Sequence, residues 1–216
     1  MLCTFDPSVL YGLSVYAPMR TPSDNAPGER RQMKHVLMAY YSHAGHTSRI
    51  ARTIQNTIIE EGHACDMVEM MEIVREGIDW SKYDIVIVGS PIVYGTYNKI
   101  VWEFCSAFKD KLEALPNSFF NVTVVARTPL KATPEGNRYL QKFVSRSAWK
   151  PRDLKCFAGK VDYPNWNLFE RTMIRIIMKI TDGPTDTNVT IDYTDYEDVK
   201  DYARYCLTLD EQQKRA

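Results

Sequence analysis

DIVIVGSPIVYGTYN, residues 84 to 98, carries the strongest strand pattern in the chain and continues into a loop rich in glycine and tyrosine. Residues 85 to 88 are all β-branched, with no alternation between polar and apolar positions. Such a run is typical of a strand that is buried on both faces of a parallel sheet. The stretch therefore predicts a sheet that is covered by helices on both sides.

Strands and helices alternate on either side of this stretch. Residues 35–41 and 64–70 are strand candidates, and between them Ile50, Ile54 and Ile58 follow the spacing of an amphipathic helix. Further along, the same patterns predict helices at 99–115, 136–147 and 195–209 and strands at 121–126 and 154–160. This order predicts an α/β fold with a doubly wound, five-stranded parallel sheet and helices on both faces. In such a sheet, ligands bind outside the carboxyl ends of the strands.

The composition is that of a globular protein of 216 residues, with 44% hydrophobic and 25% charged side chains. Lys plus Arg and Asp plus Glu both total 27, so the basic excess of a nucleic-acid binder is missing and we expect no nucleic-acid partner. The five cysteines are scattered and form no C-x-x-C pair, which indicates reduced thiols rather than disulfides or structural zinc. No apolar run is long enough for a transmembrane helix.

Two segments fall outside the regular alternation. Residues 1–32 contain Pro18, Pro22 and Pro27 without a helical or strand pattern, and we expect a disordered leader before a domain at 33–216. Residues 160–188 exceed an ordinary connection, and we expect a helical insertion there before the last helix.

The loop after the first strand, SHAGHT at residues 42–47, is suited to an anion. It opens a helix, whose first N–H groups and positive dipole end attract phosphate, and Gly45 lets the backbone approach a ligand. The loop has neither the Walker A lysine nor the G-x-G-x-x-G turn, so a monophosphate fits best. The alternative is a plain helix cap made by Ser42 or Thr47. His43 and His46 lack a nearby third ligand, so we expect no metal site.

The loops after the third and fourth strands complete the predicted site. Tyr94 and Tyr97 offer flat rings for a planar ligand, and Arg127 and Lys131 make the later loop basic. Ordinary turn chemistry is the alternative for either loop taken alone. Together, the three loops fit a ligand with a phosphate at one end and a flat ring at the other.

With these loops in place, the sequence resembles the flavodoxin-like family and, within it, the bacterial menaquinone-dependent protoporphyrinogen IX dehydrogenases. The resemblance extends from about Met33 to the end. Its most specific pieces are YDIVIVGSPIVYGTYN, NVTVVARTP, WKPRDLKCFAGKVDYP, and the insertion MIRIIMKITDGPTDT followed by YTDYEDV.

The resemblance implies FMN as the cofactor, held by all three loops. By position, the cofactor-binding residues are Ser42, His43, Ala44, Gly45, His46, Thr47, Ser90, Pro91, Ile92, Val93, Tyr94, Gly95, Ala126 and Arg127. Ala44 departs from the Thr or Ser often found there, which removes one hydroxyl donor. The chemistry then belongs to the flavin, so we expect no catalytic side chains.

The implied reaction is the oxidation of protoporphyrinogen IX to protoporphyrin IX in haem biosynthesis, with electrons passed to menaquinone or ubiquinone. Arg127, Lys131 and Arg175 are candidates for pairing with the substrate propionates. An NAD(P)H:quinone reductase and a flavodoxin-type electron carrier remain as alternatives, although zero net charge does not favour a carrier that docks through a charged face. A phosphoacceptor signalling domain would need an Asp where this chain has Tyr40, Tyr41 and Ser42.

The insertion contains a helix pattern that is largely apolar and carries one basic stripe of Arg171, Arg175 and Lys179. We expect it to lie in a membrane interface, which would place the enzyme peripherally on the cytoplasmic face of the inner membrane. The alternative is core packing or a dimer contact. The residues expected to contact the membrane are Phe169, Met173, Ile176, Ile177 and Ile180.

Overall fold

The computed structural model describes residues 32–163, 171–172, 175–176, 178–179, 186 and 188–210. Residues 33–216 form one compact unit. The predicted disordered leader lies outside the described residues, except for Gln32 at its end.

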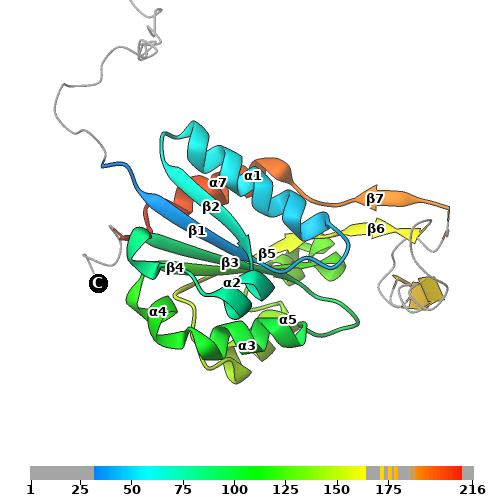
Figure 1. Cartoon of the computed structure of the whole chain (residues 1–216). Coiled ribbons are helices and arrows are strands. Elements are labelled where there is room, and N and C mark those ends of the chain that lie inside the picture. Colours follow the sequence, from blue (N-terminus) through cyan, green and yellow to red (C-terminus); the bar gives the residue numbers. More distant parts are fainter. Residues whose placement is uncertain are drawn as a thin grey trace, which may run out of the picture. The chain divides into compact units, whose positions relative to one another are not determined.

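Five parallel strands form the central sheet in the order β2-β1-β3-β4-β5 (Figure 1). They are β1 (His35–Tyr40), β2 (Ala64–Glu69), β3 (Ile85–Pro91), β4 (Asn117–Thr123) and β5 (Asp153–Ala158). The order reverses direction between β1 and β3, so the loops after these two strands diverge to opposite faces and open a crevice there. The predicted five-stranded, doubly wound parallel sheet is confirmed.

Helices cover both faces of this sheet (Figure 1). α1 (His46–Glu60) and α7 (Tyr196–Cys206) pack on one face together with Ile85 and Ile87. On the other face, Val86 and Val88 pack in a core to which further helices contribute. These helices are α2 (Met70–Glu76), α3 (Lys99–Ala107) and α5 (Arg138–Arg146), and α4 (Lys109–Ala114) adds Leu112. The four side chains from Ile85 to Val88 are fully buried, as the unbroken β-branched run predicts.

The structure differs from the sequence prediction mainly at the start of β4, within the predicted helix at 99–115 and in several short helices. β4 begins at Asn117 rather than at residue 121, because the polar side chains of Asn117 and Ser118 are buried and hydrogen-bonded within the fold. The predicted helix at 99–115 is divided at Phe108, where α3 ends and α4 begins. The short helix α2 and the one-turn helices Trp80–Lys82, Val124–Arg127 and Pro129–Ala132 follow no pattern that the sequence made visible.

The insertion is bracketed by a small antiparallel ribbon that was not predicted. β6 (Lys160–Asp162) pairs with β7 (Thr190–Asp192), so that Lys160 lies opposite Asp192 and Asp162 opposite Thr190. Gly159 ties the ribbon to the sheet, because its N–H donates to the Thr123 carbonyl oxygen at 3.2 Å. The insertion therefore leaves the sheet edge and returns to it at nearly the same place.

Within the insertion, the described residues 171–172, 175–176 and 178–179 are helical. Met178 is completely buried in a third apolar cluster with Val161 and Tyr163, whereas the Ile176 side chain is 56% exposed. The helix thus packs on the ribbon through one face, and part of the predicted apolar surface is core. Phe169, Met173, Ile177 and Ile180 lie outside the described residues. No helix in the described part of the chain combines the length and apolarity needed to cross a membrane.

Candidate functional site

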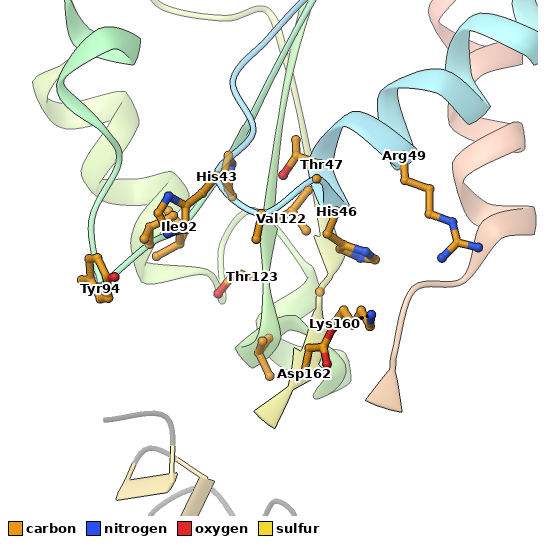
Figure 2. A pocket seen from close by; sticks show the side chains of 16 residues that line it. His43, His46, Thr47, Arg49, Ile92, Tyr94, Val122, Thr123, Lys160 and Asp162 are labelled. Carbon is orange, nitrogen blue, oxygen red and sulfur yellow. Dashed lines mark hydrogen bonds and ion pairs between the residues drawn. The ribbon is translucent and has the colours of Figure 1, made fainter. Parts of the chain in front are cut away.

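A cavity of about 590 Å³ lies at the carboxyl ends of the strands (Figure 2). Four segments of the chain meet there: the loop into α1, the end of β3, the end of β4 and the start of β6. The lining residues are His43, Ala44, Gly45, His46, Thr47, Arg49, Pro91, Ile92, Val93, Tyr94, Val122, Thr123, Val124, Gly159, Lys160 and Asp162. This is the position at which doubly wound sheets bind ligands.

The first loop turns into α1 through Gly45. Its φ of 80° lies in the left-handed region, and a Cβ built on it would meet nothing within 4 Å. The backbone angle rather than crowding therefore favours glycine. Ser42 Oγ accepts a hydrogen bond from the Ser48 N–H at 3.3 Å, which is the kind of bond that the alternative of a plain helix cap would give. The first turn of α1 still directs its positive end toward the cavity that Gly45, His46 and Thr47 line.

His46 connects this loop to the segment after β7. Its Nε2 lies 2.9 Å from Thr194 Oγ1 and 3.6 Å from Asp192 Oδ1. Burial lowers the pKa of the His46 ring; Asp192 opposes this, and Lys160 and Arg49 add to it. Figure 2 shows Arg49 and Lys160 on the side of the cavity that His46 lines. The lowered pKa favours the neutral form of the His46 ring.

The second loop contains a tight turn at Tyr94 and Gly95. The N–H of Val93 and the N–H of Thr96 each donate to the other residue's carbonyl oxygen, at 2.9 and 3.1 Å. Tyr94 has a φ of 50° and is the one non-glycine residue with positive φ in the described part of the chain. Positive φ at both central positions defines a type I′ turn, and a tyrosine there is strained. The turn holds the half-exposed Tyr94 ring against His43, with ring centroids 6.1 Å apart.

Asn137, a buried residue at the start of α5, holds the third loop through hydrogen bonds. Its Oδ1 caps α5 by accepting from the N–H groups of Tyr139 and Leu140, and its Nδ2 donates to the Lys131 carbonyl oxygen at 2.8 Å. Arg127 donates from its guanidinium to the Val124 carbonyl oxygen at 3.4 Å. These bonds support the third loop, and Val124 at its start lines the cavity.

Two of the three candidate substrate residues affect the same tyrosine. Burial raises the pKa of Tyr163, and the positive charges of Arg175 and Arg127 oppose that rise. One of these arginines belongs to the insertion and the other to the third loop. Arg175 is exposed and Lys131 is partly buried.

The cavity includes nine of the fourteen residues predicted to bind the cofactor, namely His43 to Thr47 and Pro91 to Tyr94. Among the described residues, Ser42, Ser90, Gly95, Ala126 and Arg127 lie outside this lining. Their assignment, like that of the nine, stays a prediction. The sequence analysis missed Arg49, Val122 to Val124, Gly159, Lys160 and Asp162, because the ends of β4 and β5 carry no loop motif. Nowhere in the described ranges do three or more His, Cys, Asp or Glu side chains gather as a metal site would require.

Comparison with known proteins gives a consistent result. A family model described as "Flavodoxin domain" matches residues 37–188. The protoporphyrinogen IX dehydrogenase [quinone] of Escherichia coli strain K12 is 36% identical over 169 residues, which cover 78% of this chain and 92% of that protein. The enzyme of the same name from Leishmania major is 34% identical over 175 residues, covering 80% and 74%. Oxidised flavodoxin 1 from Bacillus cereus is 15% identical, covers 81% of this chain and 97% of its own, and has a TM-score of 0.43.

Proposed function

Since the chain belongs to the flavodoxin domain family, we propose that it binds FMN and oxidises protoporphyrinogen IX to protoporphyrin IX, passing the electrons to a quinone. The observation that carries this is the 36% identity over 92% of the length of the E. coli enzyme.

The residues of the cavity fit FMN. Its volume lies within the range of about 300–1,000 Å³ that is usual for small-molecule sites. Ile92, Val93 and Tyr94 form an apolar and aromatic side, against which the flat ring would rest. The N-terminus of α1 with His46 and Thr47 forms a polar, electropositive side, suited to the phosphate.

FMN supplies the two-electron redox chemistry when it is bound. The chain binds and orients it: the type I′ turn fixes the Tyr94 ring, and Gly45 brings the backbone of the first loop toward the phosphate position. Arg127, Arg175 and Lys131 would pair with the propionates of a tetrapyrrole beside the flavin, and the positive charge that both arginines exert on Tyr163 supports this. The substrate is thereby held by charge at its carboxylates while its apolar macrocycle faces the ring.

Anaerobic turnover tests this proposal. The purified, FMN-loaded protein should convert protoporphyrinogen to fluorescent protoporphyrin when menaquinone or ubiquinone is added, and not when oxidised nicotinamide is the acceptor. Reduction of quinone by NADPH with no turnover of porphyrinogen would instead favour the NAD(P)H:quinone reductase. Slow flavin reduction with both substrates would favour a flavodoxin-type carrier.

The insertion supports a further part of the proposal, which is peripheral docking on the cytoplasmic face of the inner membrane. The exposed helix positions Thr172, Arg175, Ile176 and Lys179 combine an apolar side chain with basic ones. Basic residues beside an apolar surface suit anionic headgroups, at about 1 kcal/mol each. A quinone dissolved in lipid would also be met there.

A further inference from the structure

We propose that His46 is the residue by which this site distinguishes a phosphorylated flavin from an unphosphorylated one, because it takes up a proton when the phosphate binds. This rests on the proposed binding of FMN. His46 is the first residue of α1, directly after Gly45, and its side chain is only 16% exposed in the cavity wall.

The hydrogen bonds of Thr194 determine which ring nitrogen carries the proton in the neutral ring. Thr194 Oγ1 donates its single proton to the Ala158 carbonyl oxygen, 2.8 Å away. Toward His46 Nε2 at 2.9 Å it therefore accepts, so Nε2 bears a hydrogen. A second proton enters at Nδ1 without disturbing this bond. His46 can thus become charged while it keeps its position.

In these surroundings, protonation of His46 depends on whether a ligand is bound. Asp192 lies 3.6 Å from Nε2 and favours the imidazolium, but the same wall carries the cations Lys160 and Arg49. Lys160 is already paired with Asp162 at 2.7 Å. The titratable or charged groups that face His46 or its partners are Asp192 of β7, Lys160 and Asp162 of β6, Arg49 of α1, Tyr196 of α7 and His43 of the first loop.

A phosphate at the N-terminus of α1 changes this balance. It places up to two negative charges in the cavity beside the ring and so favours the protonated form. The phosphate gains a third cation in return. Riboflavin, which lacks the phosphate, brings no such charge and should bind without proton uptake.

Isothermal titration calorimetry tests the proposal directly. FMN and riboflavin are titrated into the apoprotein at pH 7.5 in Hepes and in Tris, whose ionisation heats differ. The difference in observed heat between buffers reports the protons taken up. Above pH 7 the phosphate is almost fully dianionic, because its second pKa is about 6. Any uptake in this range is therefore the protein's.

For the wild type we expect uptake of a substantial fraction of one proton with FMN and none with riboflavin. FMN affinity should weaken by up to tenfold per pH unit as the pH rises above 7, until the bound ring loses its proton. His46→Gln should abolish the uptake that FMN causes and flatten that slope. Asp192→Asn, a milder variant that keeps His46, should shift the slope to lower pH.

The outcomes separate this inference from the proposed function. If FMN binds the wild type with no proton uptake, or if His46→Gln retains the wild-type slope, His46 has no such role and the flavoprotein assignment stands. If the wild type binds neither flavin, the proposed function fails first. Uptake that is equal for FMN and riboflavin would place the proton elsewhere and overturn the proposal.

Discussion

Membrane docking can be tested by two substitutions only two residues apart. Ile176→Ser and Met178→Ser remove side chains of similar size from one helix. At about 100° per residue the two positions are separated by about 200°, so they lie on opposite faces. The structure agrees, because Ile176 is 56% exposed and Met178 is completely buried against Val161 and Tyr163.

The two substitutions should affect different quantities, which are membrane affinity for Ile176→Ser and folding stability for Met178→Ser. Full burial of an isoleucine stabilises by about 1.5–3 kcal/mol. Since just over half of Ile176 is free to be buried, its insertion into a lipid interface contributes about 1–1.5 kcal/mol, or roughly tenfold in affinity. Its loss should change folding stability by less than about 0.5 kcal/mol. Met178→Ser leaves a cavity and a buried hydroxyl and should cost about 2–4 kcal/mol of stability.

Cosedimentation with phosphatidylglycerol-containing vesicles measures the first effect, and urea unfolding measures the second. Ile176→Ser should retain FMN and its unfolding midpoint while losing about tenfold in vesicle affinity. Met178→Ser should instead lower the unfolding midpoint without a comparable loss of vesicle affinity. Wild-type vesicle binding by Ile176→Ser would refute the docking argument, and so would an absence of vesicle binding by the wild type.

Three further predictions concern the flavin loop, the core and the thiols. Gly45→Asp should weaken FMN binding strongly in a fluorescence titration, because it strains a left-handed position and puts a negative charge beside the phosphate; unchanged affinity would contradict the placement of the phosphate. Gly89→Ala should destabilise by about 1–3 kcal/mol in urea, because its Cβ would stand 2.2 Å from Phe120 Cζ in a filled core. Burial raises the pKa of Cys65 and Cys105 to about 12, so both should resist iodoacetamide at pH 8 until the protein unfolds. Folding favours the neutral form of both thiols. Their contribution to folding stability is therefore fully present below the ordinary thiol pKa of 9.0 and is lost as the pH rises toward 12. Alkaline unfolding curves can check this loss.

Elements that depend on apolar pattern were predictable from the sequence. β3 could be found because residues 85 to 88 are buried on both faces and need no polar positions. The last helix was predicted from residue 195, and Asp195 caps α7 by accepting from the N–H groups of Glu197 and Asp198. The start of β4 was missed for the opposite reason. Asn117 and Ser118 belong to a buried strand only because partners distant in sequence, such as Arg152 and Tyr202, satisfy them.

The site residues also divide into those that local sequence reveals and those that only long-range pairing brings to the cavity. Local turn chemistry at Gly45 and at Tyr94 to Gly95 is encoded in adjacent residues, so these loops were recognisable. Lys160 and Asp162 reach the cavity only because β6 pairs with β7 across the insertion, which is a long-range pairing without a sequence motif. The partners of His46 could not be predicted for the same reason. Thr194, for example, is separated from His46 by 148 positions in the sequence.

The pairing of Asp162 with Thr190 also makes the insertion a segment that can be exchanged without moving its two ends. Its two ends already stand at hairpin distance, so the chain between them can change in length or sequence without altering the span that the sheet must accommodate. Because loop-closure entropy grows only slowly with length, such changes have little effect on the folding of the domain. A variant in which residues 163–189 are replaced by Asn-Gly would join the two strands by a short hairpin turn. The insertion could therefore be changed or exchanged, in a design for example, while the loops that line the cavity stay as they are.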